Sequence, residues 1–340
     1  MNDAIRVGII CPSEIALRRF LPSLKDVEGI EFAGVAIADK DEWIGEVNKE
    51  IIDIEESKAK DFVQHYGGKI YNSYHELIVS KDIDAVYLPL PPALHYRWAK
   101  EALMNDKHVF VEKPSTIQLK DTEELVSLAK ERNLVLHENY MFQYHSQIQE
   151  IKDLISSNRI GKIYSYHSRF GFPMRQKSDF RYNKDLGGGA LLDAGGYISK
   201  LAVLLLGSTV KIVNSQLKYD SDFDVDMYGM VTFINNKNQV FIGEFGMSCE
   251  YQCNLSIWGS EGIITTERIY TAPDDFVPVV NIQQSSKNKK IELLSDCSFK
   301  KSIQYFILAI NDNYIKNKLY DEILLQAYYI DKIREENDYE

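Results

Sequence analysis

Residues 83–114 read IDAVYLPLPPALHYRWAKEALMNDKHVFVEKP and contain the pattern that decides the fold. The apolar runs Ile83–Leu90 and His108–Val111 predict two short buried strands, and Leu94–Asn105 between them predicts a helix. Two strands joined by such a helix are expected to be parallel, with a right-handed crossover. The stretch therefore predicts a parallel sheet that is covered by helices.

The same alternation of strand and helix extends over about the first 140 residues. Further β-rich runs predict strands at Ile5–Ile10, Phe32–Ala38 and Leu134–His137. Helical patterns are found at Glu14–Val27, Ser57–His65 and Gln118–Arg132. The charged segment Asp41–Ile54 has no counterpart in this alternation and is interpreted as an insertion. Sheets of this kind bind ligands at the carboxyl ends of their strands, so residues that follow a strand are the first functional candidates.

Beyond about residue 145 the pattern changes. Helices are predicted at His145–Ser157 and about Gly189–Leu206, and a final pair at about Ser302–Ile315 and Asp321–Glu336. Alternation of apolar and polar residues predicts strands at Lys162–Phe170, Val210–Lys218, Tyr228–Ile234, Gln239–Met247 and Cys253–Trp258. Alternation of period two indicates an antiparallel sheet with one buried face. We therefore predict an α/β protein with a parallel-sheet domain over 1–143 and an α+β domain over 144–340.

The size and charge of the chain narrow the classes of protein to which it can belong. Its 340 residues, 45% of them hydrophobic, suffice for two domains with separate cores. A net charge of -11 argues against nucleic acid or an anionic membrane as partner. The N-terminal MNDAIRVGII lacks the pattern of a secretory signal, and no run approaches the ~18 apolar residues of a membrane-spanning helix. We expect a cytoplasmic protein.

The cysteines do not form the pattern of a metal site. They are Cys11, Cys249, Cys253 and Cys297. Only Cys249 and Cys253 are close in sequence, and no histidine or second cysteine pair completes a zinc site. We expect free thiols in a reducing compartment and no metal.

The turn after the first strand, Val7–Ala16, reads VGIICPSEIA. A dinucleotide turn needs small residues so that the backbone can approach the pyrophosphate at the start of a helix. One glycine of the usual three is present, so an ordinary turn between strand and helix is the alternative. The candidate cofactor-binding residues here are Gly8, Cys11, Pro12, Ser13, Glu14 and Ile15.

Asp39 and Lys40 follow the second predicted strand. A carboxylate at this place can accept hydrogen bonds from a ribose 2′-hydroxyl and would repel the 2′-phosphate of NADP. Lys40 has the opposite effect, since its charge could pair with that phosphate. The acidic residue favours NAD slightly, and the alternative is that Asp39 only terminates the strand.

Lys113 follows the strand His108–Val111 within the tripeptide Glu112-Lys113-Pro114. A lysine at the carboxyl end of a central strand can hydrogen-bond a carbonyl oxygen and stabilise developing negative charge. Glu112 can orient the ammonium group, and Pro114 favours a cis peptide bond. The alternative is a solvated loop.

The second domain contains GGGALLDAGGY at residues 187–197. Three glycines let a loop pack against a flat ligand and then enter a helix. Asp193 and Tyr197 are four residues apart and share a helix face, where they can act as a donor pair toward a substrate hydroxyl. The alternative is a tyrosine that anchors the helix to the sheet.

These motifs, in this order, resemble the Gfo/Idh/MocA family of dehydrogenases, and most closely its branch of NDP-hexose 3-ketoreductases. The resemblance lies in the segments IALRRFLPSL, DIDAVYLPLPPALHYRWAKEAL, KHVFVEKPS, ENYMFQYHSQIQEIKDLI and DFRYNKDLGGGALLDAGGY, within residues 5–207. It implies an N-terminal Rossmann domain and a C-terminal domain with an open, mostly antiparallel sheet. In the family that sheet commonly mediates oligomer contacts.

The resemblance also implies roles for individual residues. Lys113 matches the lysine of the family's Glu-Lys-Pro motif. Tyr197 falls where the ketoreductase-like branch has a tyrosine, which implies that it is the proton donor, and Asp193 matches the aspartate one turn earlier. Cofactor-binding roles are implied for Leu88, Pro89, Leu90, His95, Glu112, Lys113 and Asn139, and for Arg181 and Tyr182 on a loop over cofactor and substrate. The departures from the family are Cys11 and Ser13 in the turn, the long segment Asp41–Ile54, and Asp39 where a small residue and an arginine are usual.

The sequence therefore predicts an NAD- or NADP-dependent oxidoreductase that transfers hydride between nicotinamide and a keto or hydroxy sugar. The first hypothesis is a reductase of a nucleotide-linked keto-sugar. One alternative is a dehydrogenase of a free sugar, cyclitol or diol, and another is a non-catalytic dinucleotide-binding regulatory protein. The expected partner besides the sugar is a second copy of the chain, in a homodimer or homotetramer.

Overall fold

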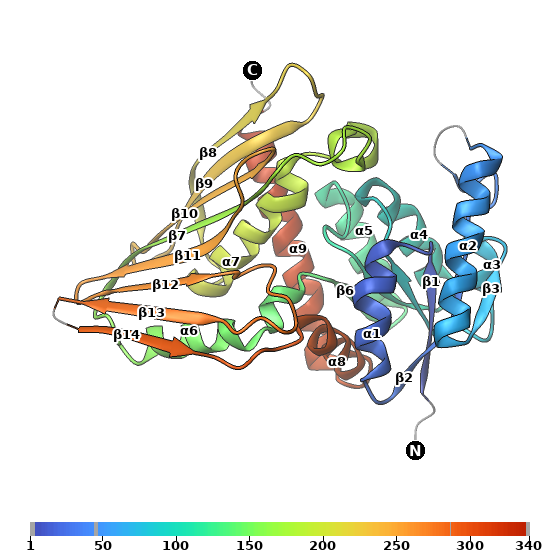
Figure 1. The fold of residues 1–340 in the computed structure, drawn as a ribbon, viewed down its shortest axis with the longest axis horizontal. Coiled ribbons are helices and arrows are strands. Elements are labelled where there is room, and N and C mark those ends of the chain that lie inside the picture. The colour runs from blue at the N-terminus through green and yellow to red at the C-terminus, as the bar shows by residue number, and fades with distance from the viewer. Residues whose placement is uncertain (1–3, 44–46, 286, 338–340) are drawn as a thin grey trace. The chain divides into compact units, whose positions relative to one another are not determined.

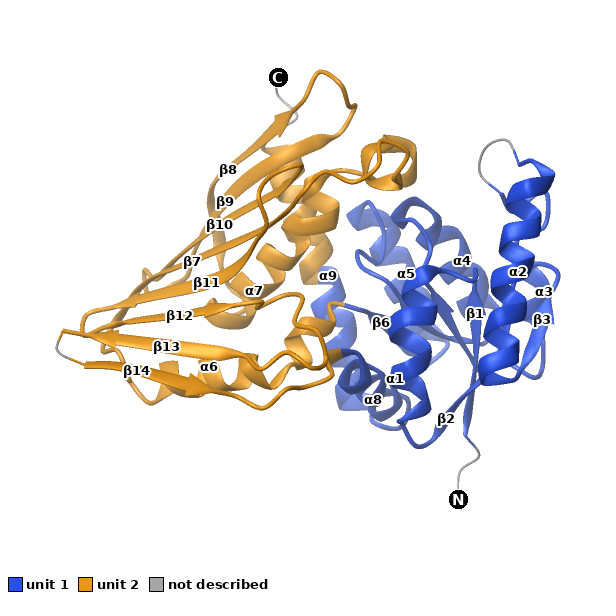
Figure 2. Cartoon of the chain, in the orientation of Figure 1, with its two compact units in different colours: residues 1–139, 299–324 blue, residues 140–298, 325–340 orange. Residues whose placement is uncertain are grey.

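The computed structural model describes residues 4–43, 47–285 and 287–337, and the chain divides into two compact units. The first unit comprises residues 1–139 and 299–324, and the second comprises 140–298 and 325–340 (Figure 2). The predicted ranges differ in that they give residues 299–324 to the second domain. This segment joins the first unit because Phe299 contacts the ring of Phe20, and Phe306 that of Phe110.

The first unit is built on a parallel sheet (Figure 1). Its strands are β1 (Ile5–Ile10), β2 (Ile30–Ala36), β3 (Lys69–Tyr71), β4 (Ala85–Leu88), β5 (His108–Val111) and β6 (Leu136–Glu138). Within the described residues their order is β3-β2-β1-β4-β5-β6. The order reverses between β1 and β4, which is where open sheets of this type bind ligands.

The strands are connected by the π-helix η1 (Ala16–Phe20) and the helices α1 (Leu21–Lys25), α2 (Lys49–Tyr66), α3 (Tyr74–Val79), α4 (Pro92–Met104) and α5 (Leu119–Glu131). Two further helices, α8 (Ser298–Asn311) and α9 (Asn313–Glu335), follow all the strands in the chain, and α9 belongs to the first unit up to Leu324 and to the second unit beyond it. Asn48 caps α2 by accepting a hydrogen bond from the amide of Ile51 at 2.9 Å. The last six residues of the segment Asp41–Ile54, 49–54, are therefore the beginning of α2, and its residues 44–46 lie outside the described residues.

The second unit is built on a larger sheet. Its strands are β7 (Ile163–Phe172), β8 (Lys211–Tyr219), β9 (Asp226–Ile234), β10 (Val240–Met247), β11 (Gln252–Gly259), β12 (Ile263–Glu267), β13 (Val279–Gln284) and β14 (Lys287–Glu292). In the described chain the order is β14-β13-β12-β11-β7-β10-β9-β8. Among the described strand pairs of this sheet only β7–β10 is parallel, so the sheet is mostly antiparallel as predicted.

The helical elements of the second unit are η2 (Met141–Tyr144), α6 (Ser146–Ser156), η3 (Phe180–Tyr182), η4 (Lys184–Leu186), the π-helix η5 (Leu191–Gly195) and α7 (Gly196–Leu206). Helix α7 packs on β7 and β10 through buried residues such as Ile198 and Leu201. Among the described residues, one helical stretch, Lys184–Leu206, is apolar and long enough to cross a membrane, and 78% of its apolar window is buried within the fold. Its composition is that of a core helix.

Candidate active site

The turn after β1 enters its helical segment at Glu14. Cys11 has φ 80°, the left-handed conformation that glycine usually provides. The hydroxyl of Ser13 accepts a hydrogen bond from the amide of Ala16 at 3.2 Å and caps the helix. Burial, and next the charge of Glu55, raises the pKa of the Cys11 thiol to about 12, so the thiol is neutral.

The same turn fits a dinucleotide. The amides of Glu14 and Ile15 lie in the first helical turn, where no intrahelical carbonyl can reach them. Neither amide has a hydrogen-bond partner among the described residues. Two such donors at the positive end of a helix suit a pyrophosphate. The turn can therefore bind this group without the full glycine motif, and the buried Pro12 lies just before these donors.

Gly8 is a predicted cofactor-binding residue, and its position also serves the packing of the sheet. It lies within β1, and an added Cβ would be 2.5 Å from Cδ2 of Leu77 in α3. Its lack of a side chain lets α3 pack closely on the sheet. Packing alone therefore accounts for a glycine at this position.

The loop after β2 is braced from within the unit. Asp39 and Lys40 are exposed, and Oδ1 of Asp39 accepts the amide of Lys40 at 2.7 Å. The amide of Asp39 donates to the buried Glu42 at 2.9 Å. Glu42 also accepts the amides of Tyr74 at 2.8 Å and His75 at 3.0 Å, where α3 begins. The Asp39 carboxylate thus sits on a loop that Glu42 fixes to α3.

Lys113 lies two residues after β5 and is partly buried. The peptide bond between Lys113 and Pro114 is cis, as the sequence suggested. Glu138, the last residue of β6, accepts the amide of Ser115 at 2.8 Å. The turn that carries Lys113 is therefore held by the neighbouring strand.

His95 in α4 holds the same turn. Its ring is fully buried, with Nδ1 2.8 Å from the carbonyl oxygen of Pro114 and Nε2 2.7 Å from that of Leu90. Burial lowers its pKa to about 4, so the ring is neutral and donates to one of these oxygens. The resemblance implied a cofactor-binding role, whereas the structure directs both ring nitrogens to the loops after β4 and β5. The other predicted residues of the β4 end, Leu88, Pro89 and Leu90, are buried.

Glu112, the partly buried neighbour of Lys113, begins a chain of hydrogen-bonded polar side chains. Glu112 accepts hydrogen bonds from the hydroxyl of Tyr87 at 2.7 Å and the amide of Asn139 at 2.8 Å. Asn139 accepts from Ser302 at 2.8 Å, and Ser302 lies 2.8 Å from Nε2 of His137. Burial raises the pKa of Glu112, although both hydrogen bonds oppose this. The network fixes Glu112 and uses the side chain of Asn139 internally.

In the second unit, Arg181 joins two carboxylates. Its Nε donates to Asp193 at 2.7 Å and its Nη1 to Asp179 at 3.1 Å. Burial lowers the pKa of Arg181, but the two carboxylates outweigh this and raise it overall. Tyr182 is buried and stacks on Phe223, with ring centroids 4.7 Å apart. Of the two predicted loop residues, Arg181 is therefore fixed to the helical segment that bears Asp193, whereas Tyr182 packs on Phe223.

Tyr197, in the first turn of α7, is enclosed by aromatic rings. Its ring centroid is 5.0 Å from that of Phe170, 5.1 Å from Tyr140, 5.6 Å from Phe142 and 5.7 Å from Tyr270. Only 7% of Tyr197 is exposed. Such packing fixes the direction of the phenol group, as a proton donor requires.

The structure thus places most of the predicted residues of the first unit at the carboxyl ends of β1, β2, β4, β5 and β6, with Gly8 within β1 and His95 in α4. Those of the second unit lie in η3, η5 and the first turn of α7. Sequence reasoning missed the supporting residues Glu42, Tyr87, Glu138, Asp226 and Ser302. The sequence signal for Tyr87 was a polar side chain within an apolar run. The roles of the other four residues depend on contacts between segments that are distant in the sequence, so no local pattern indicates them. The described residues hold no group of three or more histidine, cysteine or acidic side chains placed to bind a metal.

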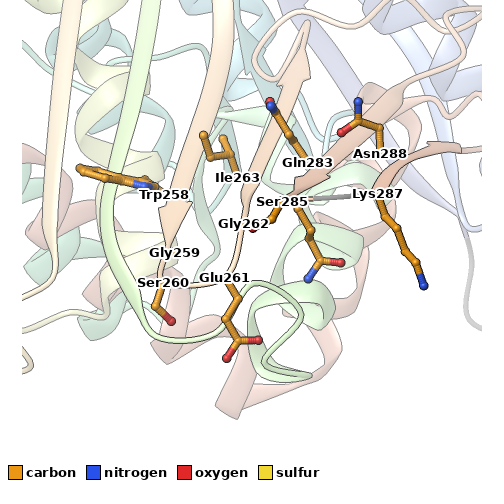
Figure 3. A pocket seen from close by; sticks show the side chains of 11 residues that line it. Trp258, Gly259, Ser260, Glu261, Gly262, Ile263, Gln283, Ser285, Lys287 and Asn288 are labelled. Atoms are coloured by element: carbon orange, nitrogen blue, oxygen red, sulfur yellow. The ribbon is translucent and has the colours of Figure 1, made fainter.

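A hollow of about 530 Å³ in the second unit is lined by none of the predicted site residues. Four lining residues, Trp258, Ile263, Gln283 and Asn288, are neighbours in register across β11 to β14 and therefore share one face of the sheet (Figure 3). Tyr197 and α7 pack on the other face. The hollow is thus a feature of the outer sheet surface.

The strand order of the first unit, its helix-terminal turn and the polar residues that follow its strands define a dinucleotide-dependent oxidoreductase with a second domain built on a mostly antiparallel sheet. Residues 31–140 match the family model described as "Oxidoreductase family, NAD-binding Rossmann fold", and residues 148–265 match "GFO/IDH/MocA C-terminal domain". The chain belongs to the Gfo/Idh/MocA family. The predicted fold class, enzyme class and nicotinamide cofactor are confirmed.

Close relatives have a common activity. The dTDP-3,4-didehydro-2,6-dideoxy-alpha-D-glucose 3-reductase of Actinomadura kijaniata is 34% identical over 98% of this chain and 95% of the relative. The reductase of the same name from Streptomyces violaceoruber is 36% identical over 83% of this chain and 78% of the relative. The structure of KijD10, a 3-ketoreductase from Actinomadura kijaniata, with NADP and TDP-benzene has a TM-score of 0.90, 33% identity and 98% coverage of both chains.

Proposed function

We propose that this protein reduces the C3 ketone of a dTDP-linked 3,4-diketo-2,6-dideoxyhexose with a reduced nicotinamide dinucleotide. The observation that carries the proposal is the likeness to KijD10, which has a TM-score of 0.90 over 98% of both chains. A likeness over the whole chain supports a shared substrate class more strongly than a shared Rossmann domain does. Among the hypotheses drawn from the sequence, this favours the nucleotide-linked sugar.

The bound dinucleotide would supply hydride to the carbonyl carbon. Tyr197 donates the proton to the carbonyl oxygen, and its aromatic surroundings hold the phenol in one direction. Lys113 polarises the oxygen and stabilises the negative charge that develops on it. Asp193, held by Arg181 at 2.7 Å, orients the substrate near the phenol.

The other proposed cofactor-binding residues contact different parts of the dinucleotide. The amides of Glu14 and Ile15 hold the pyrophosphate, and Asp39 accepts the adenosine ribose hydroxyls. An exposed Asp39 beside the exposed Asp41 favours NADH over NADPH. One unfavourable charge contact of about 1 kcal/mol gives a preference of about fivefold, which Lys40 reduces.

The test is a turnover assay with the dTDP-linked diketo sugar and either NADH or NADPH. We expect oxidation of the nicotinamide with a kcat/KM well above that for the same sugar without its nucleotide, and a lower KM for NADH. Oxidation of free sugars, cyclitols or diols in preference to reduction of the dTDP-sugar would contradict the proposed substrate. Tight dinucleotide binding without turnover of any of them would indicate a regulatory protein.

We further propose that the outer face of the second unit's sheet binds a second copy of the chain. On this face Trp258 is 58% exposed and its ring centroid lies 5.9 Å from that of Tyr164, which is 45% exposed. Further along the same face Glu244 accepts hydrogen bonds from Arg169 at 2.6 Å and Tyr228 at 3.0 Å. Exposed aromatic rings beside a satisfied polar cluster are typical of self-complementary interfaces.

Trp258→Glu should dissociate the oligomer. Truncation of a central interface tryptophan typically costs at least about 2 kcal/mol, so the dissociation constant should rise about 30-fold or more. Light scattering at a fixed protein concentration should give a dimer or tetramer for the wild type and a smaller species for the variant. Tyr314→Glu, at a tyrosine 79% exposed in α9, is the matched control. A monomeric wild type would contradict the proposal.

We also infer a cytoplasmic location. The four cysteines are all thiols, which suits a reducing compartment. The net charge of -11 supports a small-molecule partner rather than nucleic acid or an anionic membrane.

A further inference from the structure

The carboxylate of Asp226 lies at the N-terminal end of the helical segment that carries Asp193 and Tyr197. Asp226 is the first residue of β9 and is 8% exposed. Its Oδ2 accepts the amide of Leu191 at 2.6 Å, and a backbone hydrogen bond from Ala190 acts on the same carboxylate. The first turn of a helix leaves such amides without an intrahelical acceptor. Asp226 is therefore the cap of this segment.

The glycine turn before the segment packs closely against the carboxylate of Asp226. Gly189 has φ 112°, and an added Cβ would overlap Oδ1 of Asp226. The amide of Gly189 donates to the carbonyl oxygen of Arg181 at 2.9 Å, and the side chain of Arg181 donates to Asp193 at 2.7 Å. One continuous set of contacts thus joins Asp226, the turn and Asp193.

The capped segment has an uncommon backbone. Leu191–Gly195 is π-helical, and α-helix resumes at Gly196. Wide turns of this kind are rare and occur frequently at functional sites. An anionic acceptor at the N-terminus stabilises the segment through both direct hydrogen bonds and the helix dipole. Loss of the cap should let the turn relax toward α-helix, which would rotate Asp193 relative to Tyr197.

We propose that Asp226 is a positioning residue of the reaction, whose carboxylate holds the π-helical turn and thereby keeps Asp193 and Tyr197 in the arrangement that proton transfer requires. This inference rests on the proposed function, in which Tyr197 is the proton donor. Asp226 acts through the backbone of Ala190 and Leu191.

The ionisation of Asp226 should therefore affect activity at acid pH. Burial raises its pKa to about 6, while its backbone hydrogen bonds and the charge of Arg334 in α9 oppose the shift. Arg334 is paired with Asp331 at 3.0 Å, and Tyr219 of β8 lies opposite Asp226 in register. Because the folded-state pKa is above 3.8, this group's contribution to the free energy of unfolding falls as pH rises from about 4 to 6. The ionised carboxylate thus stabilises the turn locally through its backbone hydrogen bonds, while its burial costs the whole fold free energy, and such a cost is consistent with a functional role.

The test compares Asp226→Asn with Asp224→Asn, an exposed carboxylate two residues earlier. Asparagine keeps one acceptor oxygen and removes the charge. The wild-type kcat should fall about tenfold from pH 7 to pH 5, with the ionised fraction of a group of pKa about 6. In Asp226→Asn, kcat at pH 7 should be lower than in the wild type by at most about tenfold, and it should not decline further toward pH 5. The dissociation constant of NADH should be unchanged. Asp224→Asn should behave as the wild type.

Backbone hydrogen exchange over residues 190–197, measured without substrate, gives a readout independent of turnover. Asp226→Asn should exchange faster there at neutral pH, with the rest of α7 unchanged. Unchanged exchange, or an acid decline of kcat that persists in Asp226→Asn, would overturn the positioning role. Faster exchange together with a wild type that does not reduce the dTDP-sugar would support the cap and refute the proposed function.

Discussion

Tyr197→Phe should lower kcat for the dTDP-linked keto-sugar by about 10²–10⁴-fold, with little change in KM or in NADH affinity. The substitution removes only the hydroxyl, so the ring contacts with Phe170, Tyr140 and Tyr270 remain. A selective loss of kcat is the pattern of an interaction made in the transition state and not in the ground state. Single-turnover measurement of nicotinamide oxidation isolates the chemical step from product release.

The matched control for this prediction is Tyr166→Phe. Tyr166 is 1% exposed on β7 in the same unit and stacks on Phe241, but it is not a predicted site residue. It should lose little activity, which would show that removal of a buried hydroxyl from this unit is not itself the cause. A Tyr197→Phe enzyme with near wild-type kcat would exclude Tyr197 as the proton donor and return it to the role of an anchor between helix and sheet.

The residues at the strand ends of the first unit were predictable because chain order and spatial order coincide there. A short apolar run places the residue after it at the sheet edge, so Lys113 and Asp39 could be located from sequence alone. The residues that brace them could not. Ser302 reaches Asn139 across 163 positions of the chain, and Glu42 reaches the amide of Tyr74 across 32. The local periodicity of apolar residues carries no information about such contacts.

In the second unit the missed elements have a different cause. The edge strand β14 reads KNKKIE, where lysines replace the alternation on which strand prediction depends. Asp226 resembles any acidic residue before a strand, and only the geometry of Gly189 reveals what its carboxylate does. The glycine-rich motif thus indicated a functional loop, but the sequence did not indicate that Asp226 caps it.

Lys113→Met should lower kcat by about 10²–10³-fold, because it removes the charge that stabilises the developing oxyanion and keeps the apolar stem in place. The charge of Lys113 also acts on its buried neighbour, since it lowers the pKa of Glu112 against the effect of burial. Loss of that charge should raise the pKa of Glu112 further. Lys120→Met, at an exposed lysine of α5, is the control.

The double variant Lys113→Met/Tyr197→Phe decides whether the two residues stabilise the same transition state. If they act on one carbonyl oxygen, the two losses should not add, and the double variant should be little slower than the slower single variant. If Lys113 only binds cofactor, the losses should multiply, and the dissociation constant of NADH should rise for both variants that lack Lys113. The cycle therefore separates charge stabilisation at the reacting carbon from a binding role, a distinction that the turnover of a single variant cannot make because each variant lowers turnover under both assignments.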